Sequence, residues 1–526
     1  MHFCFYLKFA GHNFIYLMDR IMSVALLYSR ASVGIDAPLI LVEAHISYGQ
    51  PNFSIVGLPE KAVKESKDRV RSAIINSKFD FPHERITINL APADLPKEGG
   101  RYDLAIALGI LAATGQINKE NLSEYEFAGE LGLLGELRGI QTCLTLAIGC
   151  SKANRSLILP IENADEAALI NNLKLLPAKN LLEVCAHLLG KQHISIYKPS
   201  AEFHSSLPDQ KLNISDIKGQ HAAKRALLIS AAGGHNLLMV GPPGTGKTML
   251  ASRLPTLLPA LTESEALELA AIHSLHNYKI NSKLWRVRPF RAPHHSASTV
   301  ALVGGGNPPK PGEISLAHHG VLFLDELPEF KRDTLESLRE PLESGKIIIS
   351  RAGHQCEFPA KFQLISAMNP CPCGYLGSHQ KACRCTPDQI QRYQNRISGP
   401  LIDRIDLHIE VKALSASDLS DSPCTNQLIS GEILAQKVVF CLATQYQRQK
   451  QINAQMSIES IKQHCILSSS LQKLFAKAIH QFKFSARSVN NILKIARTIA
   501  DLDEKIDISS SHLEEALSYR LVFLGR

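Results

Sequence analysis

The eight residues at positions 241–248 read GPPGTGKT and fit the pattern G-x-x-x-x-G-K-[ST]. An apolar run at 236–240 predicts a buried strand before them, and the chain after Thr248 continues as a helix without a breaker. A glycine-rich turn between a strand and a helix directs backbone N–H groups at one point, and that point suits an anion. The pattern therefore predicts a nucleoside triphosphate site, in which Lys247 contacts the β- and γ-phosphates and Thr248 binds Mg²⁺. The predicted nucleotide-binding residues are Gly241, Pro242, Pro243, Gly244, Thr245, Gly246, Lys247 and Thr248.

Two carboxylates end a second apolar run. Residues 320–326 read GVLFLDE, which predicts a strand followed directly by Asp325 and Glu326. A strand that ends in acidic residues is common, but after a phosphate-binding loop this pair indicates hydrolysis of the nucleotide. Asp325 is suited to hold Mg²⁺, and Glu326 is suited to orient and deprotonate the attacking water. A third predicted strand, 362–369, ends in Asn369, whose amide could hydrogen-bond the γ-phosphate or that water.

Longer motifs carry a family resemblance. DIKGQ at 216–220, together with the phosphate loop, the acidic pair and Asn369, resembles an AAA+ ATPase module. RAPHH at 291–295 and KPGEISLAH at 310–318 resemble the magnesium-chelatase and MCM branch of that class. The chain is most similar to the YifB/ComM group of magnesium-chelatase-like proteins, through YSRA at 28–31, SIVGLPEKAV at 54–63, LAPADLPKEGGRYD at 90–103 and RISGPLIDRID at 396–406.

This resemblance implies an α/β fold in three parts, which we place at 23–190, 214–411 and 412–526. They are an N-terminal domain like ribosomal protein S5 and the Lon protease, an AAA+ P-loop core, and a helical lid. A polar, breaker-rich linker is expected at 191–213. The resemblance begins near Met22, so residues 1–22 are either an upstream start-site artefact or an N-terminal extension.

The resemblance implies an ATP-hydrolysing ring, a hexamer, with ATP and Mg²⁺ as its cofactors. It further implies action on single-stranded or branched DNA, as a helicase or in branch migration during natural transformation and homologous recombination. The alternative is a magnesium-chelatase-like ATPase that remodels a protein partner. Sequence alone leaves the choice between these substrates open.

Two arginines take their roles from the same resemblance. Arg404 matches the arginine finger, which enters the nucleotide site of the neighbouring subunit, where such a residue is worth about 10³–10⁵ in rate. A local salt bridge to Asp403 or Asp406 is the alternative for Arg404, and Arg396 is the alternative finger. Arg487 resembles the lid arginine that senses the nucleotide of its own subunit.

The first domain lacks the catalytic pair of the protease that it resembles. Arg101 stands where that family has its nucleophilic serine, and no lysine occurs in the later segment 135–147. Without a nucleophile and its base, peptide hydrolysis by that pair is impossible. Apolar periodicity here predicts strands at 39–46, 53–56 and 85–90 and helices at 60–76 and 103–113.

Four cysteines follow Asn369 within fifteen residues, at Cys371, Cys373, Cys383 and Cys385. Four thiolates are the full ligand set of a tetrahedral zinc site, although one residue between paired cysteines is a tighter spacing than the usual two. His379 could replace one of the four. The alternative is a reduced loop without metal, and the sequence leaves both open.

Composition bounds the compartment and the partners. The net charge of +8 over 526 residues permits a nucleic-acid partner without arguing for one. No uncharged apolar stretch reaches the about eighteen residues of a membrane span. Twelve cysteines without a secretory signal indicate the reducing cytoplasm.

Two segments are the expected DNA contacts, by analogy with MCM-type rings. One is the insertion at 291–316, and the other is a predicted hairpin at 346–361. Their basic residues are candidates for phosphate contacts, although each taken singly is better explained as a solvated surface charge. The four are Lys310, Lys346, Arg351 and Lys361.

Apolar spacing predicts lid helices around Leu471 and Val489, and a capping box at 511–514 is expected to open the last helix.

Overall fold

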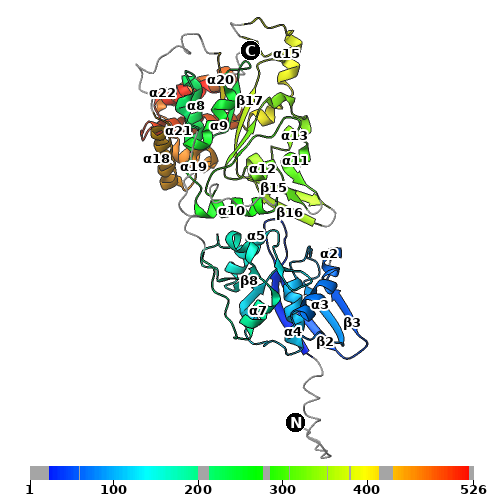
Figure 1. Ribbon diagram of the computed structural model, residues 1–526. Helices are drawn as coiled ribbons and strands as arrows, with labels where there is room; N and C mark the ends of the chain where they lie inside the picture. Colours follow the sequence, from blue (N-terminus) through cyan, green and yellow to red (C-terminus); the bar gives the residue numbers. More distant parts are fainter. Residues whose placement is uncertain are drawn as a thin grey trace, which may run out of the picture. The chain divides into compact units, whose positions relative to one another are not determined.

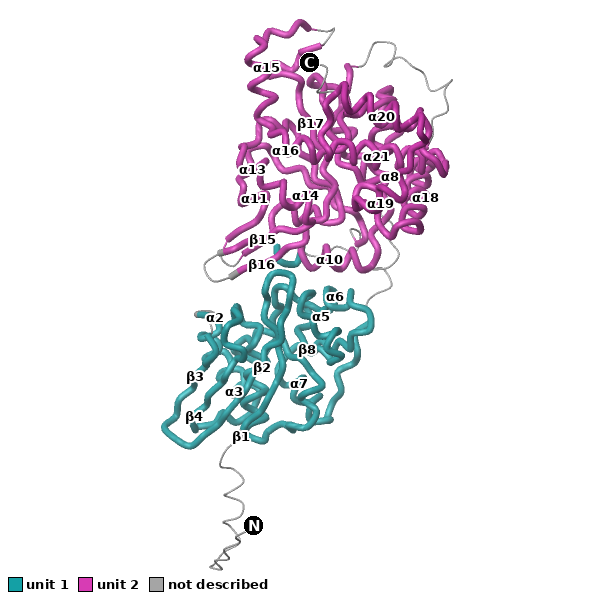
Figure 2. The backbone as a smooth tube through the Cα atoms, turned by 180° about the vertical axis from the view of Figure 1, so that it is seen from behind, with its two compact units in different colours: residues 1–206, 273–282 teal, residues 207–272, 283–526 magenta. Residues whose placement is uncertain are grey.

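The computed structural model describes residues 23–58, 60–198, 212–276, 285–306, 309–351, 354–377, 381–413 and 430–520. The chain forms two compact units, one of Met1–Ser206 with His273–Ser282 and one of Leu207–Ile272 with Lys283–Arg526 (Figure 2). The expected N-terminal extension or artefact, most of the expected linker and the start of the expected lid lie outside the described residues. None of the described helices is both long enough and apolar enough to cross a membrane.

A mixed sheet of four strands forms the core of the first unit, in the order β1-β2-β4-β3. β1 (Ser23–Arg30) pairs antiparallel with β2 (Leu39–Ser47), which pairs antiparallel with β4 (Arg85–Ala91). β3 (Asn52–Val56) pairs parallel with β4 at the other edge. Alternate residues of β2 and β4 are buried, because successive side chains of a strand point to opposite faces. The three strands predicted in this region are confirmed.

Helices cover this sheet. α4 (Asp103–Ala113) packs on β1 and β2 and is buried at every position, which confirms the predicted apolar helix. The single helix predicted at 60–76 is wrong in one respect, because the chain forms α2 (Lys61–Lys64) and then α3 (Ser66–Asn76).

Buried polar contacts hold the helix starts in this unit. The Asp103 carboxylate accepts hydrogen bonds from Ser66 Oγ and, at 2.7 Å, from Arg69 Nε, and this fixes the first turn of α3 against α4. A pattern of apolar residues does not reveal this contact between polar side chains. Arg101 is also buried, and it donates to Thr142 Oγ1 at 2.9 Å.

A second, smaller sheet completes the first unit. Its parallel strands run in the order β5-β8-β9. The strands and helices of this region are β5 (Tyr125–Phe127), α5 (Cys143–Lys152), β8 (Ser156–Pro160), α6 (Ala164–Ala167), β9 (Leu175–Ala178) and α7 (Leu181–Leu188). Between β5 and α5, β6 (Glu130–Leu131) and β7 (Leu137–Arg138) pair antiparallel in a sheet of their own. The helices α5 and α6 pack beside β8 and β9 in a separate apolar cluster, whereas α7 joins the main cluster of the unit.

The second unit is built on a parallel sheet of five strands in the order β11-β14-β17-β10-β18. Three of them are the predicted strands: β10 (Leu237–Val240), β14 (Val321–Leu324) and β17 (Gln363–Met368). The other two are β11 (Phe290–Arg291) and β18 (Leu407–Glu410). Since the strands are parallel, the residues that follow them all emerge at one edge of the sheet.

The C-terminal helices pack against the helices on one side of this sheet (Figure 1). α18 (Gly431–Gln449) and α21 (Ala486–Leu502) contact α8 (His221–Gly233), and their apolar residues join the apolar cluster around β10 and β17. α9 (Lys247–Leu257) follows the phosphate loop. Among the described residues, the further α-helices that lie wholly or mostly in this unit are α10 (Glu263–Ser274), α11 (Thr299–Val303), α12 (Glu313–Leu316), α13 (Arg332–Glu336), α14 (Pro341–Ser344), α15 (Pro387–Gln394), α16 (Gly399–Ile402), α19 (Ile458–His464), α20 (Ser469–Phe482) and α22 (Ser510–Ser518).

The capping box of α22 lies two residues earlier than predicted. Ser509 Oγ accepts from the backbone N–H of His512, and His512 Nδ1 accepts from the N–H of Ser509. Histidine thus takes the place that glutamate or glutamine has in the usual box. The predicted start at Ser511 is therefore wrong.

The two segments expected to contact DNA both form hairpins. β15 (Lys346–Arg351) pairs antiparallel with β16 (His354–Pro359), which confirms the predicted hairpin. β12 (Gly304–Gly305) pairs antiparallel with β13 (Lys310–Pro311) inside the insertion. A Cβ placed on Gly304 would lie 2.8 Å from the Cδ1 of Ile349, so the two hairpins pack against each other.

Candidate functional site

The phosphate loop connects β10 to α9 at the edge where the strands end. Gly244 and Gly246 have left-handed backbone conformations, with φ of 77° and 86°, which a side chain would strain. A Cβ placed on either glycine would meet no heavy atom within 4 Å beyond its chain neighbours. Open space therefore lies beside the loop at the N-terminus of α9, where an anion such as phosphate fits.

The Lys247 ammonium group lies folded against its own loop. Nζ donates to the carbonyl oxygens of Gly241 and Pro242, each at 2.8 Å, and lies 3.4 Å from Asn369 Oδ1. Burial lowers the pKa of Lys247, while the acidic pair after β14 acts to raise it. A bound phosphate would raise the pKa of this amine and give it anionic oxygens in place of neutral ones.

The two residues predicted to hold Mg²⁺ are in contact. Thr248 Oγ1 donates to Asp325 Oδ2 at 2.8 Å. Thr248 lies in the first turn of α9, after β10, and Asp325 directly follows β14. In the sheet, β17 lies between β10 and β14. A hydroxyl oxygen and a carboxylate oxygen are donors that suit Mg²⁺, so the arrangement fits this ion.

Glu326 has a partner that the sequence did not reveal. Its backbone is left-handed, with φ of 50°, and its Oε2 lies 3.1 Å from His295 Nδ1. Both side chains are partly exposed, at 50% and 35%. His295 follows β11 at the same edge of the sheet, and it belongs to the RAPHH motif, to which the sequence alone gave no chemical role. The polar residues after a short strand were the available signal.

Arg404, the predicted arginine finger, makes its contacts within its own chain. Arg404 Nη2 contacts Glu343 Oε1 at 2.7 Å, and its Nη1 donates to the Pro400 carbonyl oxygen at 2.7 Å. The alternative of a local pair with Asp403 or Asp406 is wrong, because Arg404 pairs with α14 instead. The other finger candidate, Arg396, pairs with Glu329 at 2.7 Å.

Arg487 converges on the same carboxylate. Its Nη1 lies 2.6 Å from Glu343 Oε1, the oxygen that Arg404 also contacts. Hydrogen bonds from Arg487 and then from Arg404 hold the pKa of Glu343 below its usual value. Arg404 and Glu343 line a pocket of about 510 Å³. The structure thus brings the two predicted arginines together, and it joins neither of them to the phosphate loop of the same chain.

These features define a class of protein. A parallel sheet whose glycine-rich loop aligns a threonine with an aspartate two strands away is the arrangement of P-loop nucleotide-binding proteins. The C-terminal helices packed on the core place it in the AAA+ class.

Comparison with known proteins agrees with this assignment to the AAA+ class. Three family models match successive parts of the chain: "Subunit ChlI of Mg-chelatase" at 42–163, "Magnesium chelatase, subunit ChlI" at 213–419 and "Magnesium chelatase, subunit ChlI C-terminal" at 429–520. The chain is 51% identical over 507 residues to competence protein ComM of Haemophilus influenzae, covering 95% of this chain and 98% of that one. It is 50% identical over 502 residues to YifB of Escherichia coli, with the same coverage.

The chain therefore belongs to the YifB/ComM family of magnesium-chelatase-like AAA+ proteins. Similarity to a magnesium chelatase itself is weaker. The 38 kDa subunit from Cereibacter sphaeroides is 26% identical over 188 residues, or 30% of this chain and 52% of that subunit.

Proposed function

We propose that this protein is an ATPase that works as a ring-forming motor on DNA. The contact of Thr248 with Asp325 carries the ATPase proposal, because a bound nucleotide needs its Mg²⁺ at this point. Mg²⁺ would neutralise charge on the phosphate oxygens. Lys247 binds the phosphates, Glu326 orients and deprotonates the water, and Asn369 hydrogen-bonds the γ-phosphate or that water.

The position of the two arginines supports a ring. Arg404 and Arg487 lie together on Glu343, and each guanidinium keeps further N–H groups for a second anion. We propose that both turn to the nucleotide of the neighbouring subunit, so that each site is shared between two chains. This differs from the cis role expected for Arg487 from the sequence. A closed hexamer is the assembly that the family resemblance favours.

The packed hairpins support DNA as the substrate. The β12–β13 and β15–β16 hairpins lie side by side, and Lys310 is exposed on the first of them. Lys346 is the weaker candidate, because it pairs with Glu357 at 2.9 Å. Lys361 is exposed just beyond β16, whereas the side chain of Arg351 lies outside the described residues.

One relative bears the name of a competence protein. We propose a role for this chain in unwinding or branch migration, during natural transformation and homologous recombination. Its location would be the cytoplasm, where thiols stay reduced.

We expect ATP-dependent binding to forked and single-stranded DNA, with little base preference and a steep dependence on salt. Binding to the phosphate backbone, which is the same for every sequence, releases condensed counterions. The logarithm of the binding constant therefore falls with the logarithm of the salt concentration, with a slope of about −0.7 for each neutralised phosphate of a single strand. Lys310→Glu should flatten this slope by at least about 0.7 and leave basal ATP hydrolysis intact. Fluorescence anisotropy across a salt series measures the slope.

The control for this experiment is Lys473→Glu, which reverses an exposed charge on α20. Strand displacement on forked and four-stranded DNA should occur with ATP in the parent protein. If no form of DNA binds or stimulates hydrolysis at low salt, the proposal for DNA fails, and the remodelling of a protein partner becomes the better account.

His295 offers a test of the role of Glu326. The imidazole holds one carboxylate oxygen at 3.1 Å and so competes with water for it. A partly exposed ion-pair contact of this kind is worth up to about 1 kcal/mol, so His295→Ala should raise basal hydrolysis by up to roughly fivefold. His294→Ala is the matched control, because His294 hydrogen-bonds Ser296. An equal effect of both substitutions on the steady-state rate would contradict this role.

A further inference from the structure

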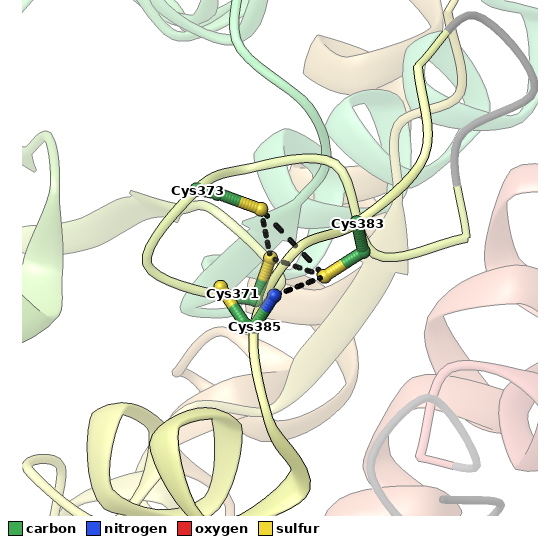
Figure 3. A group of neighbouring side chains, drawn as sticks. All are labelled: Cys371, Cys373, Cys383 and Cys385. Atoms are coloured by element: carbon green, nitrogen blue, oxygen red, sulfur yellow. Dashed lines mark hydrogen bonds between the residues drawn. The ribbon is translucent and has the colours of Figure 1, made fainter.

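The four cysteines after β17 converge on one point (Figure 3). Cys371 Sγ lies 3.4 Å from Cys373 Sγ and 3.6 Å from Cys383 Sγ, and Cys373 Sγ lies 3.6 Å from Cys383 Sγ. With Cys385, all four sulfur atoms lie within 4.8 Å of one another. They come from two short segments, each of the form C-x-C, that the loop brings together.

These separations are those of a metal-thiolate site. Zinc holds each sulfur at about 2.3 Å, and the edge of a tetrahedron with that radius is about 3.8 Å. A disulfide would bring two sulfurs to about 2.05 Å, and all ten cysteines of the described residues are free thiols. Four thiolates would complete the tetrahedral coordination of one cation and leave no coordination position for a substrate, which is typical of a structural site.

Backbone N–H groups surround the sulfurs in the manner of a preformed site. Cys385 N–H donates to Cys383 Sγ at 3.5 Å, and the N–H groups of Tyr375 and Arg384 donate to Cys373 Sγ. Gly374, with φ of 83°, makes the turn that directs them. Such donors stabilise negative sulfur and fix the orientation of the ligands.

The cysteine loop also contacts the phosphate loop. Cys371 follows Asn369 by two residues, and a Cβ on Gly374 would lie 2.7 Å from Pro243 Cδ and 3.8 Å from Asn369 Cγ. Gln394 of α15 donates to the Pro370 carbonyl at 3.0 Å and holds the same turn. The loop that carries the four cysteines therefore packs against the predicted nucleotide site.

We propose that Cys371, Cys373, Cys383 and Cys385 bind one structural Zn²⁺, which fixes Asn369 and Pro243 in place beside the nucleotide. The proposal that these cysteines bind zinc does not depend on any enzymatic activity. The proposed effect of the zinc on turnover rests on the proposed ATPase function. His379, the alternative ligand, lies outside the described residues.

The metal content tests the site directly. Protein purified without an affinity tag under reducing conditions should contain about one zinc per chain, measured by mass spectrometry of the metal. Cys373→Ser with Cys385→Ser should abolish it, whereas Cys465→Ala, a buried cysteine elsewhere in the same unit, should not. Zinc near zero in the parent protein, or retained zinc in the double variant, would overturn the site.

A second measurement avoids dependence on variants that fold poorly. Parent protein exchanged with Co²⁺ should show the intense visible bands and sulfur-to-metal charge transfer of a tetrahedral thiolate complex. A spectrum of octahedral Co²⁺ without charge transfer would overturn the assignment.

The rate of ATP hydrolysis tests whether the zinc site affects catalysis. We expect the zinc-free double variant to keep its affinity for ATP within a few-fold and to lose at least about tenfold in kcat, because displacement of a positioning group by about 1 Å can cost about 100-fold. An unchanged kcat would refute the effect of the zinc site on catalysis but would not affect the assignment of the metal site itself. Zinc in a parent protein that does not hydrolyse ATP would instead refute the proposed function.

Discussion

Lys247→Ala is expected to abolish measurable ATP binding, whereas Glu326→Gln is expected to bind ATP as the parent does and to lose about 10²–10⁴ in turnover. The two residues lie at one site and act on different states of the reaction. Lys247 acts on the charge of the bound nucleotide, and Glu326 acts on the water that attacks it.

The loss at Lys247 follows from its surroundings. The ammonium group is buried against the carbonyls of Gly241 and Pro242, and burial already lowers its pKa. Hydrogen bonds to charged groups contribute about 1.5–3 kcal/mol each, and this amine would make more than one to the phosphates. Alanine would leave the two carbonyls and the nucleotide without their cation.

Glu326→Gln changes no volume and keeps a hydrogen-bonding side chain beside His295. It removes only the ability to accept a proton, so the effect should fall on kcat and leave the Kd of ATP nearly unchanged. Lys473→Ala and Glu432→Gln, at exposed positions on α20 and α18, are the controls. Fluorescent-nucleotide titration and a phosphate-release assay separate binding from turnover. Parent-like hydrolysis by the Glu326 variant would show that another group is the base.

Much of this site could be predicted because it depends on local pattern and on one rule of topology. Apolar runs marked β10, β14 and β17, and the polar residues that follow parallel strands meet at one edge of the sheet. Thr248 and Asp325 therefore had to lie close together, although 77 residues separate them.

Two of the contacts that the sequence did not reveal have no period and no fixed spacing. Glu343 lies 61 residues before Arg404 and 144 before Arg487, on a helix of four residues. The first turn of α3 hydrogen-bonds a buried carboxylate on another helix, Asp103 of α4. His512 replaces an acidic residue in the cap of α22. In the first two cases the contact joins residues far apart in the sequence, which local patterns do not reveal, whereas the capping box is local and was missed because histidine takes the place of glutamate or glutamine.

The shared carboxylate leads to the second large prediction. Arg404→Ala is expected to lose about 10³–10⁵ in hydrolysis while each subunit still binds ATP, since a finger stabilises charge that develops in the transition state. Arg487→Ala should reduce hydrolysis in the same sense. Steady-state ATPase and nucleotide binding, measured on the same preparations, establish both effects. A normal rate in the Arg404 variant would exclude it as the finger.

Mixing inactive proteins distinguishes action within a chain from action across the interface. The Lys247→Ala protein lacks a working phosphate loop but still presents Arg404 and Arg487. If both arginines act on the neighbouring subunit, a mixture with either arginine variant assembles some sites that combine an intact loop with intact arginines, and activity returns. If Arg487 acts within its own chain, no mixed site contains both that arginine and an intact loop. We therefore expect partial recovery with both arginine variants. If activity returns only in the mixture with Arg404→Ala, Arg487 acts within its own chain. If it returns in neither mixture, the result argues against nucleotide sites shared between subunits.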